Sequence, residues 1–584
     1  MQIRRGAAGA PCHPPPAIVC GEVLHAVKSG PQANSSHFTL AMEKPSVYLD
    51  KYTVQAALAS AVEHILQTRP SDPLSAISEF LFSRLPPSVL APGETTVGAL
   101  HAEALPGGAL ESRLVRLGLD ASRASGFAAA AKRLIDAGIS PSTRAFAFWV
   151  PGRIEVAGKH TDYAGGRSLL CAANRGFAVV SAEREDAACR IFATFELTGE
   201  QAEAEVRLDA SASEPLPEGW ALYPAVTARR LARNFGLRGG ISLALSCDLA
   251  EASGMSSSSA VITLMFLALA ARNKLGSSPE LVRALPTAEQ LAHYLGCIEN
   301  GQDCGPSLPG DRGVGTFGGS EDHTAILLCG AGELRQYSFC PTRLEARVRM
   351  PPGLVFVLAV SGAVARKGAE RLADYNNAAL LAGWAATSAV EGGPDAERRA
   401  DWAVRPTLAA VTRAAAARLQ MPPAAPAVKQ AVMDSIIPAD NGTHPSGCEA
   451  GALARRFDQF HTESEVVVPG LARALGGGEA AGAVDTAAIG TLVDLSQKLT
   501  ASHLRNTLPE TEWLPETARS LGALGASAFG AGFGGSVWAL VEVGKAQSFA
   551  AEWEAAYVSA FPDRASLARF FVMATPAPGA CSVV

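Results

Sequence analysis

Three segments rich in glycine and serine, spaced widely along the chain, constrain its fold most. They read PGRIEVAGKHTDYAGG (Pro151–Gly166), EASGMSSSSA (Glu251–Ala260) and FGAGFGGS (Phe529–Ser536). The middle segment lies between an apolar run typical of a strand and one typical of a helix. Small residues there let backbone N–H groups approach an anion, and a helix N-terminus favours negative charge. Taken alone, this segment is explained better by a serine-rich N-cap before a core helix.

In this order the three segments resemble the signature motifs of the GHMP small-molecule kinases, in their galactokinase-like form. The resemblance covers about residues 141–575. It implies a two-lobed α+β GHMP kinase fold, with ATP and Mg²⁺ between the lobes. Phosphoryl transfer requires the protein to hold the phosphates and a Mg²⁺ ion and to align the attacking hydroxyl. The other two segments therefore favour the phosphate-binding interpretation of the middle one.

The resemblance assigns the nucleotide and the metal to named positions. The middle segment matches the family pattern GLSSSA, with Met255 for Leu and Ser259 for Ala. The implied ATP-binding residues are Gly254, Ser256, Ser257, Ser258 and Ser259. Ser258 is also the implied contact to Mg²⁺ or phosphate. A second Mg²⁺ ligand is Glu299, because Cys297-Ile-Glu-Asn resembles the family's AEN segment.

The catalytic residues follow from two further matches. Gly319-Ser-Glu-Asp-His occupies the place of the family's GxxDQ segment, which makes Asp322 the expected base or orienting anion. Glu321 is a nearby competitor. Arg153 aligns with the arginine beside the catalytic aspartate. A neighbouring arginine lowers the pKa of a carboxyl group and keeps it ionised.

The sugar-binding positions implied by the resemblance are Lys159, His160, Asp162, Gly319 and Tyr375. Carboxylates suit a sugar because they accept hydrogen bonds from adjacent hydroxyls. Lys159 stands where galactokinases have glutamate, so a donor replaces an acceptor. Glu155 and Ala164 replace two asparagines of the same motif. Lys159 could pair with the carboxylate of a uronic acid.

The resulting functional prediction is ATP-dependent phosphorylation of a monosaccharide at its anomeric hydroxyl, with galactose as the first candidate. A uronic-acid 1-kinase acting on galacturonate is the alternative suggested by Lys159. A different class remains open: a catalytically silent, galactokinase-like sugar sensor or scaffold. Retention of Arg153, Ser258 and Asp322 favours the enzyme.

Composition excludes several other classes. With 48% hydrophobic and 18% charged residues the chain is globular, and its net charge of −6 gives no reason to expect nucleic-acid binding. Eleven cysteines are scattered without a CxxC pair, which favours a reducing compartment over a disulfide framework or zinc ribbon. We find no apolar run long enough to span a bilayer. A cytoplasmic location is expected.

A helical hairpin is predicted at residues 46–84. Apolar residues form one stripe from Val54 to Leu66, the segment Arg69-Pro-Ser-Asp-Pro breaks the chain, and a second apolar stripe follows. The sequence from Tyr48 to Leu81 resembles the dimerisation–docking hairpins of protein kinase A regulatory subunits. That resemblance implies a homodimer through a four-helix bundle that binds an amphipathic anchoring helix. Such a hairpin would tether the enzyme, for example at a flagellum or the cytoskeleton. Packing of the hairpin on the kinase is the alternative.

The remaining boundaries follow from composition. Residues 1–45, rich in Pro, Gly, Ala and Ser, are predicted as a disordered tail, with a transit peptide as the alternative. Residues 85–140 are predicted as a linker with one helix around Ser122–Ala137. The N-terminal lobe is placed at 141–345 and the C-terminal lobe at 346–575. Residues 385–453 are predicted as helices with an insertion loop, of unassigned role.

Overall fold

The computed structural model describes residues 90–208, 214–250, 254–363, 369–390, 406–436, 448–477, 484–573 and 575–584. The predicted tail at 1–45 and hairpin at 46–84 lie outside the described residues. The first lobe is built on a nine-stranded sheet whose main path runs β1-β2-β3-β6-β4-β5, with β13 beside β2, β7 beside β3 and β8 beside β7. Its strands are β1 (Thr95–Thr96), β2 (Arg144–Ala157), β3 (Arg167–Glu183), β4 (Ala188–Phe195), β5 (Gln201–Arg207), β6 (Ile241–Cys247), β7 (Glu333–Ser338), β8 (Arg343–Arg349) and β13 (Cys581–Ser582).

The long strand β2 carries the first motif and is irregular where the motif lies. Its antiparallel register with β3 shifts between Pro151 and Arg153 and again between Glu155 and Ala157. Such bulges bend a strand and redirect its side chains, and they are frequent next to functional sites. Beyond the second shift, His160 has a positive φ of 57°. The motif is therefore a bent strand end and a turn.

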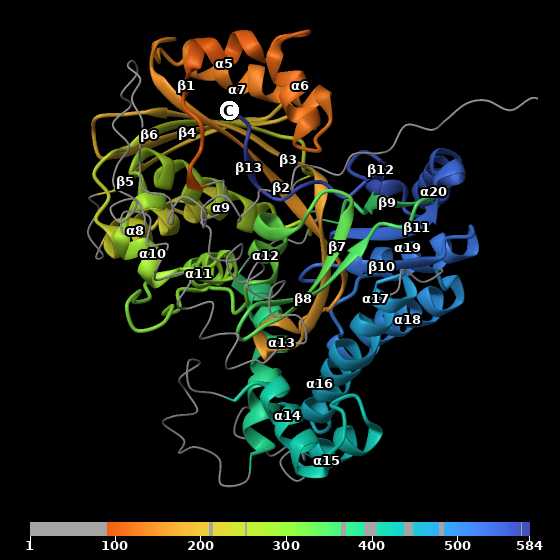
Figure 1. Ribbon diagram of the computed structural model, residues 1–584. Coiled ribbons are helices and arrows are strands. Elements are labelled where there is room, and N and C mark those ends of the chain that lie inside the picture. The colour runs from red at the N-terminus through yellow and green to blue at the C-terminus, as the bar shows by residue number, and fades with distance from the viewer. Residues whose placement is uncertain are drawn as a thin grey trace, which may run out of the picture. The chain divides into compact units, whose positions relative to one another are not determined.

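Helices cover both faces of this sheet (Figure 1). One face holds α5 (Val97–Glu103), α6 (Ala109–Arg116) and α7 (Ala124–Asp136). The other holds α8 (Leu222–Phe235), α9 (Ser257–Arg272), α10 (Pro279–Ala284), α11 (Ala288–Asn300) and α12 (Glu321–Leu328). Helix α9 is buried on almost every side, as expected for a helix apolar all round. The helix predicted near 122–137 is α7. The residues before it, predicted as a linker, instead form α5 and α6, whose Leu100 and Leu114 share an apolar core with α7.

The second lobe is a four-stranded antiparallel sheet in the order β10-β11-β9-β12. Its strands are β9 (Leu354–Val360), β10 (Gly525–Phe529), β11 (Ser536–Glu542) and β12 (Arg569–Met573). The helices α19 (Pro509–Ser520) and α20 (Ala546–Ala560) pack on one face, and α17 (Val468–Ala474) and α18 (Thr486–Leu499) belong to the core on the other. The residues after the third motif form β11. Although the residues before that motif are rich in alanine, as in a helix, α19 ends at Ser520 and β10 follows, because the small residues of β10 pair along β11.

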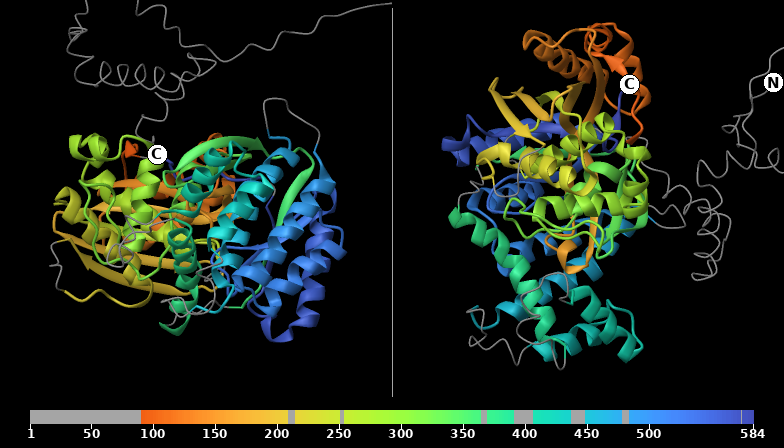
Figure 2. Two further views of the ribbon diagram at one scale, coloured as in Figure 1. Left: turned by 90° about the horizontal axis from the view of Figure 1, so that it is seen from below. Right: turned by 90° about the vertical axis from the view of Figure 1, so that its left-hand side faces the viewer.

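A group of helices extends below the two sheets in Figure 1 and can be followed in Figure 2. It comprises α13 (Ala369–Ser388), α14 (Leu408–Leu419), α15 (Pro426–Ile436) and α16 (Ala452–His461), which share an apolar core. Helix α16 continues into a π-helical turn, Thr462–Val467. The helices predicted within 385–453 are therefore present in its described parts.

The lobe boundary predicted at 345 is shifted. Strand β8 runs to Arg349 and pairs with β7 in the first sheet, so the first lobe includes residues beyond 345. Strand β13 also returns to this sheet, where Cys581 pairs with Trp149. Within the described ranges, no helix combines the length and apolar character needed to cross a bilayer.

Candidate active site

An ion pair joins the first motif to the segment predicted to hold the base. Arg153, on β2, is only 4% exposed, and its Nε donates to Asp322 Oδ1 at 2.7 Å. Asp322 lies in the first turn of α12, where the helix dipole favours a negative charge. Burial raises the pKa of Asp322, but the adjacent Arg153 guanidinium outweighs burial, and the pKa lies below its usual value. The carboxylate is therefore ionised, as the sequence predicts.

A small cavity of about 160 Å³ opens beside this pair. Most of the predicted substrate and metal residues line it. They are Arg153, His160, Asp162, Ser258, Ser259, Glu299, Gly319, Asp322 and Tyr375. Gly319 has a local reason to be glycine, because a Cβ atom would collide with Asp162 Oδ2. Asp162 Oδ2 also accepts the N–H of Glu321 at 3.1 Å, which fixes the carboxylate against α12.

His160 is held as a neutral ring. Its Nδ1 lies 2.9 Å from the Tyr163 hydroxyl, and its Nε2 lies 3.1 Å from Asn506 Nδ2. Burial, followed by the nearby Arg456, lowers the pKa of His160 to about 4. Nε2 also lies 3.3 Å from the Ala531 carbonyl oxygen, so groups on both sides hold the ring. The ring is fixed in orientation at neutral pH.

The competing base is engaged elsewhere. The Glu321 carboxylate accepts a hydrogen bond from Ser168 Oγ at 2.6 Å and is buried. Burial, together with the charges of Glu155 and Asp162, raises the pKa of Glu321. A protonated carboxyl group is a poor base, so the geometry favours Asp322 over Glu321.

Lys159 requires a correction. Its side chain is 2% exposed, lines neither of the cavities described here, and its ammonium donates to Ser527 Oγ on β10. The turn around it is fixed by Glu463, whose Oε1 accepts the N–H of Gly158 at 2.8 Å. Burial lowers the pKa of Lys159, while Glu463 and Glu155 oppose that change. Lys159 is thus a buried structural cation, and the prediction of a sugar contact fails because the turn directs it to the second lobe.

A carboxyl group reaches the small cavity from another position, Glu155. It is 2% exposed and lines the cavity; its Oε2 accepts the Gly530 N–H at 3.0 Å. Its Oε1 has no hydrogen-bond partner in the part of the chain that the structure describes. Burial raises the pKa of Glu155 to about 7, against the lowering effects of Arg153 and Lys159. The sequence shows Glu155 as a departure from the family motif but gives it no role.

A larger cavity of about 550 Å³ meets the small one at Arg153, Ser258 and Asp322. Gly254, Ser256 and Ser257 line it together with Ser258. Ser256 caps α9 with a positive φ of 59°, so the loop enters the helix through a left-handed turn. The opposite wall is apolar and aromatic, and sequence reasoning missed it. It includes Phe177, Phe195, Trp220, Tyr223, Leu245 and Val261.

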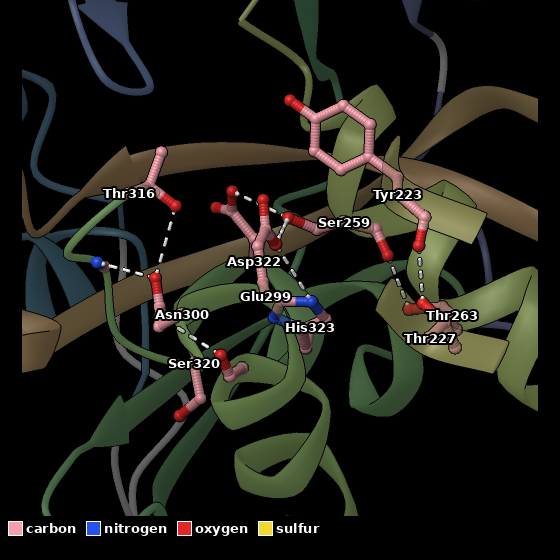
Figure 3. A network of polar contacts seen from close by, with 12 residues as sticks. Tyr223, Thr227, Ser259, Thr263, Glu299, Asn300, Thr316, Ser320, Asp322 and His323 are labelled. Atoms are coloured by element: carbon pink, nitrogen blue, oxygen red, sulfur yellow. Dashed lines mark hydrogen bonds and ion pairs between the residues drawn. The ribbon is translucent and has the colours of Figure 1, made fainter. Parts of the chain in front are cut away.

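Oxygen donors cluster where the two cavities meet (Figure 3). Ser259 Oγ donates to Glu299 Oε2 at 2.7 Å and lies 3.4 Å from Asp322 Oδ2. Ser259 therefore faces the small cavity, whereas its neighbour Ser258 lines both. His323 Nε2 lies 3.2 Å from Glu299 Oε2. Carboxylate and hydroxyl oxygens are the donors that Mg²⁺ prefers, so the residues present fit this ion.

The third motif closes the site from the second lobe. A Cβ atom at Gly530 would approach the carbonyl oxygen of Gly254 to 2.7 Å, so the two glycine segments meet only because both lack side chains there. Ser361 Oγ donates to the Gly535 carbonyl at 2.7 Å. Tyr557 in turn donates to the Ser361 carbonyl at 2.6 Å. Tyr375 lines both cavities and packs edge-on against Phe533.

The fold and the paired cavities define a class: a two-lobed α+β protein in which a serine-rich helix N-terminus faces an arginine–aspartate pair. Three protein-family models match parts of this chain. They are the galactokinase galactose-binding signature at residues 140–183, the GHMP kinases N terminal domain at 223–310 and the GHMP kinases C terminal model at 479–559. Each of the three glycine segments lies within one of these matched ranges, and the two GHMP kinase models match in chain order.

Individual relatives are galactokinases. The chain is 33% identical to the galactokinase of Actinobacillus pleuropneumoniae serotype 5b over 114 residues, 19% of this chain and 28% of that protein. It is 29% identical to that of Bacillus subtilis (strain 168) over 185 residues, 31% of this chain and 44% of that protein. The matched segments thus span less than half of these relatives.

A solved structure establishes the fold. The crystal structure of Lactococcus lactis galactokinase complexed with galactose resembles this chain with a TM-score of 0.56 at 20% identity. The match covers 77% of this chain and 98% of the other. The predicted two-lobed α+β GHMP kinase fold is confirmed.

Replacing Glu155 by Gln tests its buried, protonated state. Its folded-state pKa of about 7 exceeds the ordinary 4.5, so the folded protein retains a proton that the unfolded chain has lost between these values. Wild-type stability should therefore fall as pH rises from about 4.5 to about 7, by about 3 kcal/mol from this group. Chemical unfolding of Glu155→Gln should lack this component, while the exposed Glu554→Gln should retain it. Parallel pH profiles for wild type and Glu155→Gln would contradict the assignment.

Replacing Lys159 by Met tests its structural role. The change removes the electrostatic pairing of Lys159 with the buried Glu463 and its hydrogen bond to Ser527 Oγ, a loss of about 1–3 kcal/mol. Unfolding measurements should show this loss and should show recovery when Glu463→Gln is added, because the double variant leaves no unpaired charge. Equal stability of Lys159→Met and wild type would refute the pairing.

Proposed function

We propose that this protein transfers the γ-phosphoryl group of ATP to the anomeric hydroxyl of a monosaccharide, and that the sugar is galactose. The observation that carries the proposal is the position of the Arg153–Asp322 pair. It lies where a small polar site meets a large cavity whose wall is the serine-rich loop. The galactokinase galactose-binding signature at residues 140–183 supports the choice of sugar.

The large cavity suits the nucleotide. Its aromatic wall, with Trp220 and Tyr223, offers faces on which a purine ring can stack. The loop from Gly254 to Ser258 lines the same cavity and ends at the N-terminus of the 16-residue helix α9. Backbone N–H groups and the helix dipole favour phosphate at that end. Adenine on the aromatic wall thus places the phosphates toward Asp322.

The small cavity suits a sugar hydroxyl facing Asp322. The lowered pKa keeps this carboxylate ionised, so it can accept a hydrogen bond from the hydroxyl and orient it, or take its proton. Arg153 fixes the carboxylate and places positive charge beside the junction, where transferred phosphate carries negative charge. Asp162, the neutral ring of His160 and Tyr375 provide further polar groups on the cavity wall. Holding both reactants in one geometry supplies much of the rate enhancement.

Mg²⁺ belongs to this proposal. Ser258 and Glu299, with Ser259 between Glu299 and Asp322, would hold the ion. The chemistry that Mg²⁺ would supply there is neutralisation of phosphate charge.

The geometry favours a neutral hexose over a uronic acid. The galacturonate alternative rests on Lys159, whose ammonium is directed to Ser527 and away from the small cavity. The cavity contains the carboxyl groups of Glu155, Asp162 and Asp322 instead. A substrate carboxylate would meet the ionised Asp322 there, whereas sugar hydroxyls can donate to the oxygens of all three groups. The intact Arg153–Asp322 pair also supports an enzyme over a silent sensor.

Asp322→Asn is the direct test of catalysis. Removing an ionised base should lower kcat by about 10²–10⁴-fold, while ATP affinity measured by calorimetry changes little. Glu321→Gln, one residue away, should retain far more turnover. A panel of galactose, glucose and galacturonate identifies the substrate. Binding of ATP without phosphorylation of any sugar, or full turnover by Asp322→Asn, would overturn the proposal.

From sequence alone, we further propose that residues 46–84 form a dimerising, docking hairpin that tethers the enzyme to an anchoring helix. The apolar stripe from Val54 to Leu66 supports this proposal, because two short helices cannot bury such faces by themselves.

Light scattering of the full chain should give the mass of a dimer. Deletion of residues 46–84, or Leu58→Arg within the stripe, should give a monomer with unchanged kinase activity. Equal masses for all three proteins would refute the hairpin proposal.

A further inference from the structure

Three metal-ligating side chains converge outside the two cavities. His293 and Cys297 lie one turn apart on α11, and Cys304 follows in the loop after that helix. Their ligand atoms all lie within 4.8 Å of one another. His293 is exposed, Cys297 is buried and Cys304 is intermediate, so the cluster is rooted in the core and opens to solvent. None of the three lines either cavity of the proposed active site.

The spacing fits one tetrahedral ion. His293 Nε2 and Cys297 Sγ are 3.6 Å apart. A tetrahedral Zn²⁺ with Zn–S of about 2.3 Å and Zn–N of about 2.0–2.1 Å separates these two ligand atoms by about 3.5 Å. The side chains of α11 therefore stand at the separation that such a centre requires. An exposed edge beside three protein ligands leaves the fourth position to water or another donor.

Backbone contacts fix the third ligand independently of a metal. The loop leaves α11 through Gly301, at a φ of 74°, and Cys304 N donates to the Leu308 carbonyl at 3.0 Å. The buried Arg230 guanidinium donates to the carbonyls of Gln302 and Leu308, at 2.8 and 3.1 Å. Cys304 is thus held between two pinned carbonyl groups. These contacts hold the loop that carries Cys304 in place without a bound metal.

We propose that His293, Cys297 and Cys304 form a binding site for a thiophilic divalent cation, Zn²⁺. Two sulfur ligands and one imidazole select Zn²⁺ over Mg²⁺, which takes oxygen donors. Two thiolates neutralise the ion's charge, and Arg230 supports the loop that carries one of them. The site is separate from the oxygen donors proposed for Mg²⁺, although Glu299 and Asn300 of the same helix line the small cavity.

The site is tested on the reduced, full-length protein after chelator treatment, with Co²⁺ as the probe. Co²⁺ should bind once per chain with a thiolate-to-metal charge-transfer band and the visible bands of tetrahedral cobalt, and Zn²⁺ should displace it. Cys304→Ser and His293→Ala should each weaken binding by more than about 100-fold. Cys448→Ser, a cysteine outside the cluster, should bind as wild type does.

Two controls keep the test decisive. Unfolding temperatures of the metal-free variants should equal that of the metal-free wild type, and only the wild type and Cys448→Ser should gain stability with Zn²⁺. Absence of the charge-transfer band, or equal Co²⁺ affinity in wild type, Cys304→Ser and His293→Ala, would overturn the proposal. Turnover is not a readout, so the outcome is independent of the proposed kinase function.

Discussion

The Arg153 side chain joins segments of the site that lie far apart in the sequence. Its Nε bonds Asp322 on α12, and its Nη1 contacts the Gly254 carbonyl in the serine-rich loop. A Cβ atom at Gly530, in the second lobe, would lie 3.5 Å from its Nη2. The Arg153 guanidinium therefore contacts α12 and the serine-rich loop, and it lies beside the third motif. Its planar fork can hold several acceptors in a fixed geometry, which a lysine cannot do.

The site concentrates buried charge, and its charges are compensated locally. Arg153, Glu155, Lys159, Asp162 and Glu321 are all at most 8% exposed. Burial raises the pKa of Glu155 and Glu321, so protons offset part of the negative charge, while the arginine keeps Asp322 ionised. Neighbouring carboxyl groups with opposite pKa shifts thus take different charge states: Asp322 is ionised, and burial favours the neutral forms of Glu155 and Glu321.

Motifs with fixed spacing could be predicted from sequence, and residues that meet only through tertiary structure could not. Arg153, Asp322 and Ser258 sit in short contiguous patterns. Trp220 and Tyr223 face Phe177 and Leu245 across separate elements, and nothing in their sequence spacing shows this. The position of the Lys159 side chain cannot be predicted from the motif, because the bulges of β2 and the turn at His160 alter where each side chain points. The alanine-rich stretch before Phe529 resembles a helix, yet pairing with β11 determines that it is a strand.

The shared wall of the two cavities has a thermodynamic consequence. Arg153, Ser258, Asp322, Tyr375 and Ala531 line both, so a ligand in either cavity constrains side chains that the other ligand also contacts. Two ligands that order the same side chains do not bind independently, because the first ligand has already ordered the groups that the second one contacts. If the first ligand changes the affinity of the second by some factor, the second ligand changes the affinity of the first by the same factor. The Ala531 backbone, supplied by the second lobe between two glycines, makes this coupling depend on how the lobes meet.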